Sequence, residues 1–189
     1  MKRPRSKSPQ LTLEFIRLAG PWRMRKKLAA ALESVLPDLM ARSAKLPHGT
    51  YVITVALTDD RQQKALNHQF RGINKPTNVL SFPQFSPRAL AKIKPGSAPV
   101  PLGDISLAYQ YIVCEATTDH KILCNHIIHL VIHGILHILG YNHETARQAA
   151  AMETLERIIL DAMQIPDPYA PPPATPRRSR TRISQQKSQ

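Results

Sequence analysis

The chain has few cysteines and no hydrophobic run long enough to cross a membrane. Its two cysteines, Cys114 and Cys124, are too few and too widely spaced for a disulfide framework, a CxxC redox pair or a zinc ribbon. We expect both to be small buried hydrophobic residues in a reducing compartment. The longest apolar stretch, residues 127–140, is shorter than a membrane span and contains three histidines. The basic residues 1–9 are not followed by the apolar core of a signal peptide, so we expect a soluble, cytoplasmic protein with no membrane partner.

Acidic residues are scarce as well. The chain has 13 Asp and Glu against 26 Lys and Arg, which gives a formal net charge of +13. Residues 1–9 and residues 166–189 carry +4 each, which leaves +5 for residues 10–165. This excess favours a polyanionic partner such as nucleic acid, although solvated charge that only aids solubility gives the same composition. The body of the chain has one local basic cluster, formed by Arg17, Arg23, Arg25, Lys26 and Lys27.

Between two polar ends the pattern alternates between strands and helices. Four segments have the alternation or the β-branched content of strands, namely residues 11–19, 50–57, 78–82 and 102–108. Five have helical periodicity, namely residues 22–45, 60–70, 109–118, 121–139 and 145–163. Residues 1–9 and 166–189 have too little apolar surface to offset the entropy of ordering, so we expect disordered tails. The sequence thus predicts a single α/β (α+β) domain over residues 10–165, with one mixed sheet of about four strands and about five helices.

Local features add detail to this prediction. Pro37 lies inside the first helical segment and is expected to kink or split it. Thr58 or Asp59 is expected to cap the second helix. The Pro-, Ser- and Lys-rich loop at residues 83–101 fits either a functional flap or a mobile insertion. The inward face of the last helix is expected to hold Met152, Leu155, Ile158, Ile159 and Met163.

The segment HLVIHGILHILGYNH, residues 129–143, carries the densest set of chemically active side chains. His133 and His137 are four residues apart on a predicted helix, so they share a face and can bind one ion. Gly140 fits the left-handed residue that ends the helix, and the reversed chain then brings His143 toward the pair. Three neutral imidazoles with a fourth position left for water are typical of a catalytic zinc site. We therefore predict one zinc-like ion and hydrolytic chemistry at the C-terminal end of a core helix.

The other histidines are weaker candidates. A pair four residues apart on an apolar helix also fits a hydrogen-bonded core pair, and it is the third histidine beyond the glycine that favours a metal. His126 and His129 lie on nearly the same helical face and are candidates for ligands or, preferably, for hydrogen-bonding partners of the ligands. Surface or structural roles are expected for His48, His68 and His120.

The general base is not apparent. Zinc peptidases with the HExxH motif carry a glutamate directly after the first histidine. Here that position is Gly134. Glu144 follows the third histidine and is a candidate base, but an acid there also fits the start of the next helix, where it complements the helix dipole. The sequence leaves the identity of the base open.

Four segments are similar to the signatures of one family. HGILHILGYNH (133–143) resembles HGxLHLxGYDH, and LNHQFRGINKPTNVLSFP (66–83) resembles LNxxFRxxDxPTDVLSFP. LGDISLA (102–108) and METLERIILDAMQIPDPY (152–169) resemble an LGDI strand and a C-terminal helix that follow in the same order. Over most of residues 50–169 the chain therefore resembles the YbeY family of bacterial rRNA-maturation endoribonucleases.

The resemblance implies a single-domain fold with one Zn²⁺ ion held by His133, His137 and His143. It implies a metal-dependent endoribonuclease that prefers single strands, matures the 3′ end of small-subunit (16S) ribosomal RNA and acts in ribosome quality control. The implied partners are ribosomal RNA and the small ribosomal subunit. It also implies that Arg71 is the functional arginine beside the metal, and a guanidinium does offer a bidentate fork to phosphate.

Three positions depart from the family pattern. Asn74 and Asn78 stand where aspartates are usual, and Asn142 replaces the aspartate of GYDH. Asn142 keeps a hydrogen-bonding side chain without the charge, which is expected to shift metal affinity or the pKa of bound water. Two other functions remain open, a metallopeptidase-like hydrolase and a non-catalytic ribosome-assembly factor with a structural metal. Gly134 argues against the peptidase.

Overall fold

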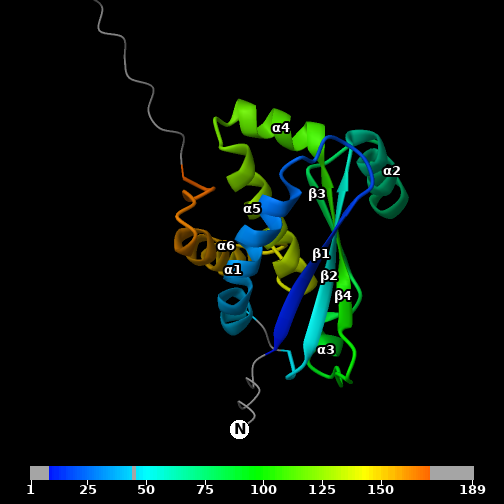
Figure 1. Ribbon diagram of the computed structural model, residues 1–189, viewed down its shortest axis with the longest axis vertical. Coiled ribbons are helices and arrows are strands. Elements are labelled where there is room, and N and C mark those ends of the chain that lie inside the picture. Colours follow the sequence, from blue (N-terminus) through cyan, green and yellow to red (C-terminus); the bar gives the residue numbers. More distant parts are fainter. Residues whose placement is uncertain (1–8, 44–45, 171–189) are drawn as a thin grey trace, which may run out of the picture.

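The computed structural model describes residues 9–43 and 46–170 (Figure 1). The strands are β1 (Gln10–Arg17), β2 (Thr50–Thr58), β3 (Val79–Pro83) and β4 (Val100–Ala108). The helices are α1 (Arg25–Ser43), α2 (Asp60–Arg71), α3 (Pro87–Leu90), α4 (Tyr109–Thr118), α5 (Leu123–Ile138) and α6 (Ala146–Ala162). The sixth helix, α3, lies inside the segment expected to be a loop, where Ser86 caps its first turn.

The strands form one mixed sheet in the order β1-β2-β4-β3. β1 and β4 are both parallel to β2, and β3 is antiparallel to β4. Helices α1, α5 and α6 cover one face, and α2 packs on the other (Figure 1). The predicted fold class, a single α+β domain with a four-stranded mixed sheet, is confirmed.

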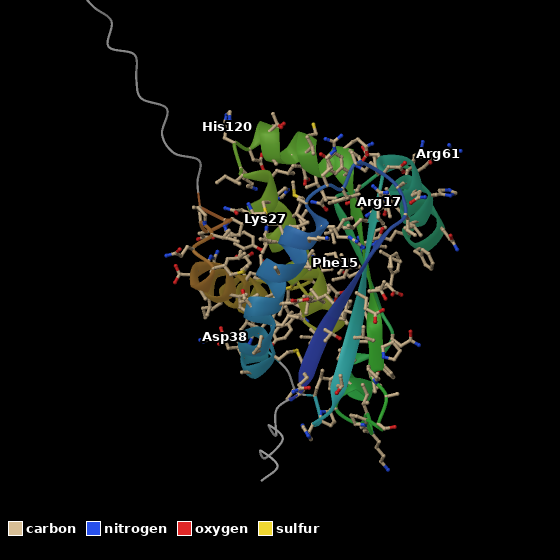
Figure 2. All side chains as sticks on the ribbon, viewed as in Figure 1. Phe15, Arg17, Lys27, Asp38, Arg61 and His120 are labelled. Carbon is tan, nitrogen blue, oxygen red and sulfur yellow. The ribbon has the colours of Figure 1, made fainter. Side chains whose placement is uncertain are left out.

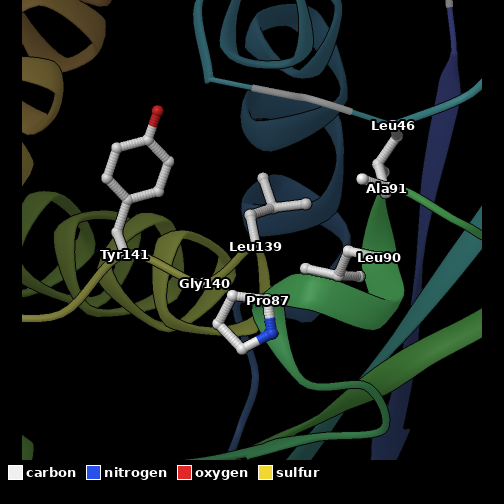
Figure 3. Close-up of a pocket in the computed structure, with 7 residues that line it drawn as sticks. All are labelled: Leu46, Pro87, Leu90, Ala91, Leu139, Gly140 and Tyr141. Atoms are coloured by element: carbon white, nitrogen blue, oxygen red, sulfur yellow. The ribbon is translucent and has the colours of Figure 1, made fainter.

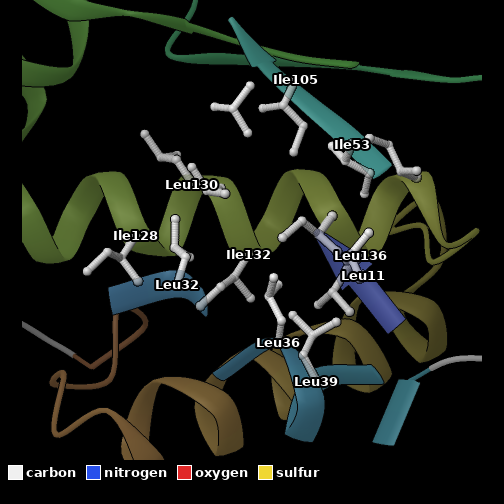
Figure 4. Close-up of a cluster of buried hydrophobic side chains, with 14 of the residues drawn as sticks. Leu11, Leu32, Leu36, Leu39, Ile53, Ile105, Ile128, Leu130, Ile132 and Leu136 are labelled. Carbon is white, nitrogen blue, oxygen red and sulfur yellow. The ribbon is translucent and has the colours of Figure 1, made fainter. Parts of the chain in front are cut away.

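Helix α5 is the centre of the hydrophobic core. Ten of its sixteen residues are buried, and it lies between the sheet and α1 (Figure 4). Ile53 and Ile105 meet it from the strands, and Leu32 and Leu36 meet it from α1. Each such side chain contributes about 1.5–3 kcal/mol by leaving water. Because α5 is held on two sides, the side chains along its remaining face have fixed positions.

The cap of α2 forms as the sequence suggested, but Pro37 does not act as expected. Asp59 is the cap, and its carboxylate accepts a hydrogen bond from the Gln62 amide at 2.9 Å. Pro37 lies within α1, which runs on unbroken from Arg25 to Ser43. Pro37 and Glu33, whose carbonyl loses a helical partner, are both exposed, so water can hydrogen-bond that carbonyl.

Three burial predictions were wrong. Cys114 is exposed and Cys124 half-buried, because the buried residues of the short helix α4 are Ile112 and Ala116, on the side away from Cys114. Ile158 is 39% exposed. The inward position that it was expected to take on α6 belongs instead to a charged residue, Glu156.

The C-terminal tail was predicted to begin at residue 166, but residues from there to 170 contact the domain. Residues 166–170 pack against α6, where the Asp167 carboxylate lies 3.2 Å from Nε of Arg157. The Arg157 guanidinium in turn lies 4.9 Å from the centre of the Tyr169 ring. The first five residues of the predicted C-terminal tail therefore contact α6, and residues 1–8 and 171–189 of the two predicted tails lie outside the described residues.

The helices in the described part of the chain differ from a membrane span in length or composition. None of its helices is by itself both long and apolar enough to cross a membrane. Only α4 and α5 taken together have the necessary length and composition, and they are bent by 117° relative to one another.

Candidate metal centre

The end of α5 reverses the chain beside His137. The Gly140 amide donates to the His137 carbonyl at 3.0 Å, and the Tyr141 amide donates to the Leu136 carbonyl at 3.0 Å. Gly140 has φ of 89°, the left-handed conformation that this pattern of bonds requires. The Asn142 side chain then accepts the His143 amide at 2.9 Å. This turn directs His143 back toward the helix, as the position of Gly140 predicted.

His133, His137 and His143 come together at this turn. One ring nitrogen from each lies within 4.8 Å of the corresponding nitrogen of the others. Nε2 of His133 and Nε2 of His137 are 3.0 Å apart, and the His143 ring centre lies 5.6 Å from that of His133 and 4.9 Å from that of His137. His133 and His137 are half-buried and His143 is exposed, so the cluster is open to solvent on one side.

Hydrogen bonds place the protons of two rings away from the centre of the cluster. Nδ1 of His133 faces the Glu156 carboxylate at 2.8 Å, and Nδ1 of His137 faces the Tyr141 carbonyl at 3.1 Å. Both partners are acceptors, so each Nδ1 carries the proton of a neutral imidazole. The two Nε2 lone pairs then face each other, an arrangement that a cation between them stabilises. The residues therefore fit a divalent metal ion held by three imidazoles.

The charge state of His137 suits this role. Burial, followed by the neighbouring His133 and His143 rings, lowers the pKa of His137 to about 4. The ring is therefore neutral at pH 7, which is the form that binds a metal.

Glu156 is the residue that the motif analysis missed. It is fully buried on α6, where its carboxylate contacts Nδ1 of His133 at 2.8 Å and Nε2 of His129 at 3.2 Å. The Tyr169 hydroxyl donates a short hydrogen bond to the same carboxylate. Burial alone would raise the pKa of Glu156, but these three hydrogen bonds outweigh it and lower that pKa to about 2. The signal in the sequence was a carboxylate in helical register with Met152 and Ile159.

A second group, formed by His129, His133 and Glu156, also has ligand atoms within 4.8 Å of one another. Here the carboxylate oxygens lie at hydrogen-bonding distance from the rings, so direct hydrogen bonds account for the contacts. Glu156 thus fixes the orientation of His133, the common arrangement of a metal-bound histidine with a carboxylate behind it. His129 hydrogen-bonds the same carboxylate and so helps to hold Glu156 in place behind His133.

Glu156→Gln is expected to weaken Zn²⁺ binding by about 10–100-fold, because a neutral amide makes His133 a poorer donor and fixes its tautomer less well. Competition with a coloured chelator measures the dissociation constant. Glu153→Gln is the matched control, since Glu153 lies one turn away on α6 and pairs with Arg157 at 3.1 Å. Equal affinity in the Glu156 and Glu153 variants would show that Glu156 does not tune the site.

Arg71 and His137, one of the three clustered histidines, line one cleft of about 230 Å³. Arg71 reaches it from the last turn of α2, His137 from α5 and Asn142 from the turn. Phe85 and Pro87, at the start of the 83–101 segment, also line the cleft. The structure therefore brings the predicted arginine and a predicted ligand to the same cavity, although they are 66 positions apart in the chain.

The 83–101 segment supports the turn that carries His143. Helix α3 packs against it, and Pro87, Leu90, Leu139 and Tyr141 surround a neighbouring pocket (Figure 3). A Cβ on Gly140 would lie 3.1 Å from the Pro87 ring. This contact fixes the turn from outside, so the first part of the segment serves as a wall of the cleft.

Two positions are candidates for a general base, namely position 134, where HExxH peptidases carry a glutamate, and Glu144. A Cβ on Gly134 would lie 2.9 Å from Cδ1 of Ile105 and 3.1 Å from Oγ of Ser81, so a glutamate there would require these two side chains of the sheet to shift. Glu144 is exposed directly before Thr145, the residue that caps α6. It is not among the residues that line the cleft of Arg71 and His137 or the neighbouring pocket of His133 and His143.

Gly134→Glu, which would complete an HExxH motif, is expected to lower the free energy of unfolding by more than about 3 kcal/mol. Overpacking costs about 1–3 kcal/mol, and a buried unpaired carboxylate adds to that cost. Thermal denaturation followed by circular dichroism measures the effect. Gly96→Glu is the control, because a Cβ at Gly96 meets no atom within 4 Å. A Gly134 variant as stable as this control would refute the close packing.

Asn78 belongs to a separate network. Its Nδ2 donates to both Glu115 carboxylate oxygens, at 3.1 and 2.9 Å, and Glu115 also contacts Nε2 of His126 at 3.0 Å. An aspartate at position 78 would oppose Glu115 with a like charge, so the amide suits this neighbour. His126 therefore lies outside the ligand cluster. The surface positions expected for His48, His68 and His120 agree with their exposure.

Comparison with known proteins supports the resemblance found in the sequence segments 66–83, 102–108, 133–143 and 152–169. The family model described as "Endoribonuclease YbeY" matches residues 22–164. Proteins named "Endoribonuclease YbeY" from Bartonella henselae and Nitrobacter hamburgensis are 41% and 42% identical to the chain. The first match covers 85% of this chain and 98% of the relative, and the second covers 84% and 82%.

Among solved structures, the solution structure of the Thermotoga maritima protein TM1509 has the same fold, with a TM-score of 0.51 and 20% identity. That match covers 86% of this chain and all of the other. At this identity the likeness concerns the fold alone. The family model, by contrast, covers most of the chain, and the two relatives are matched over 98% and 82% of their own length. This chain therefore belongs to the YbeY endoribonuclease family.

Proposed function

We propose that this protein is a zinc-dependent endoribonuclease that cleaves single-stranded RNA. Its proposed substrate is the 3′ end of small-subunit (16S) ribosomal RNA, in maturation and in ribosome quality control. The proposed partners are that RNA and the small ribosomal subunit, and the proposed location is the cytoplasm. The observation that carries the proposal is the cleft that Arg71 shares with His137. Family membership supports the reaction class.

The residues around this cleft have distinct roles in the proposed reaction. His133, His137 and His143 would hold the ion, which when bound supplies a Lewis acid and a water of lowered pKa. Glu156 and the Tyr141 carbonyl keep the two helix histidines in the binding tautomer. Arg71 is exposed at the rim, where its guanidinium can bind two non-bridging oxygens of a phosphate and offset charge that develops during cleavage. Asn142 holds the turn without adding a negative charge.

The deciding experiment uses purified protein with its zinc content measured and a labelled single-stranded RNA that ends in the small-subunit rRNA 3′ sequence. The same RNA in a duplex and a DNA of the same sequence are the substrate controls. We expect cleavage of the single-stranded RNA that stops with chelator and returns with Zn²⁺. A fully metallated protein that binds this RNA and leaves it intact would favour the assembly-factor function. Cleavage of an unstructured peptide instead would favour the peptidase.

A further inference from the structure

Helix α2 carries a row of basic side chains along one exposed flank. Arg61, Lys64, His68 and Arg71 follow at spacings of three, four and three residues, and all four are exposed. At 3.6 residues per turn these positions fall within about 80° of the helix circumference and span about 15 Å along its axis. These four residues are called the α2 basic row. Figure 2 shows Arg61 at its outer end, pointing away from the sheet.

Arg61, Lys64 and Arg71 of the α2 basic row are cations, and none of them forms an ion pair with the two acids at the start of the helix. Asp59 and Asp60 are the acids at the start of the helix, and each has a backbone partner: the Gln62 amide at 2.9 Å for Asp59 and the Tyr111 amide at 2.9 Å for Asp60. Within residues 9–43 and 46–170, no member of the row takes part in an ion pair. The row therefore presents its positive charge to solvent, which favours an anionic ligand.

Buried polar anchors fix the direction in which this row faces. Gln63 donates to the Ser106 carbonyl at 3.1 Å, and Asn67 donates to the Lys75 carbonyl at 2.7 Å. Both anchors are buried, and Phe70 on the same helix packs edge-on against Phe82 of β3, with ring centres 4.9 Å apart. Because an unpaired buried amide is costly, these bonds resist rotation of the helix about its axis. The row thus keeps one orientation relative to β4.

The row leads to the metal centre. Its last member, Arg71, lines the cleft that also contains His137 and Asn142, whereas Arg61 lies about three turns away at the other end of the helix. A line of basic side chains that runs from solvent to a reaction cleft matches the way in which single-stranded nucleic acid is held, by its backbone in a basic track. We propose that the α2 basic row binds successive phosphates of the RNA strand on one side of the cleaved bond.

This inference rests on the proposed function, and its test measures binding separately from cleavage. Fluorescence anisotropy with a labelled single-stranded RNA gives the affinity of the metal-loaded protein over a series of salt concentrations, and gels check that the RNA is intact. Each phosphate contact contributes about 0.7 to the slope of log affinity against log salt. The Arg61→Ala, Lys64→Ala double variant is expected to bind more weakly and to reduce the magnitude of the slope by about 1.4.

A charge-matched variant separates the row from net charge. Lys26→Ala with Lys27→Ala removes the same charge from exposed positions on α1, on the other side of the sheet (Figure 2), and is expected to keep the wild-type slope. An unchanged slope in the Arg61, Lys64 variant, or an equal loss in both double variants, would overturn the proposed track. If wild type binds RNA through the row but never cleaves it, the track stands and the proposed activity fails. If wild type cleaves and the row variant binds as well as wild type, the activity stands and the track fails.

Discussion

His133→Ala is expected to lose both Zn²⁺ binding and RNA cleavage. The substitution removes one of three nitrogen donors and leaves the buried carboxylate of Glu156 without the partner at 2.8 Å. Mutation of a residue that hydrogen-bonds a metal ligand already lowers metal affinity by about 10–100-fold. Removal of a ligand itself should therefore lower the affinity for Zn²⁺ by more than about 100-fold. Zinc content after dialysis and cleavage of the single-stranded RNA measure the two effects together.

The loss of that buried partner also threatens the fold, so His143→Ala is the companion variant. His143 is exposed, and its removal leaves the bonds of Glu156 intact. The expected result is the same loss of metal and cleavage with a wild-type melting temperature measured on the chelated proteins. His120→Asn serves as the control, because His120 is exposed at φ of 54°, which asparagine tolerates. Full cleavage by a metal-free His143 variant would refute the metal-dependent reaction.

Arg71→Ala is expected to keep the metal and to lower kcat by about 10²–10³-fold, the usual cost of removing one group that stabilises transition-state charge. Arg71 is exposed at the rim of the cleft, so its loss should change neither folding nor zinc content. Single-turnover cleavage at saturating RNA separates this effect from weaker binding. Arg71→Lys should recover only part of the rate, since an ammonium lacks the planar fork.

Arg88→Ala is the control for Arg71, because Arg88 is an exposed cation on α3, next to the cleft-lining Pro87. It is expected to leave kcat unchanged. Wild-type kcat in the Arg71 variant, or an equal loss in both variants, would remove Arg71 from the reaction. A loss of zinc in the Arg71 variant would instead assign the arginine to the fold of the site.

Local sequence patterns were sufficient for most of the secondary structure. Period-two alternation located β1, β-branched residues located β2, and the glycine at position 140 located the turn that carries His143. These features depend on neighbours within a few residues, so they can be predicted without a partner element. The failures have a local cause too. Pro37 should have broken α1, but its helix keeps that side in solvent.

The sequence by itself predicted that His133, His137 and His143 gather at the end of one helix, because their spacing around Gly140 brings the three side chains to one point. It could not assign the partner of His133, since Glu156 lies 23 positions away on another helix. It also could not show that a side chain at position 134 would come into close contact with Ile105 of β4. Nor could it show that Arg71 and His137 share a cleft, because α2 and α5 lie on opposite faces of the sheet. The spacing of the three histidines is set within residues 133–143, a single short stretch of chain. The contacts of Glu156, Ile105 and Arg71 arise only when separate elements pack in three dimensions.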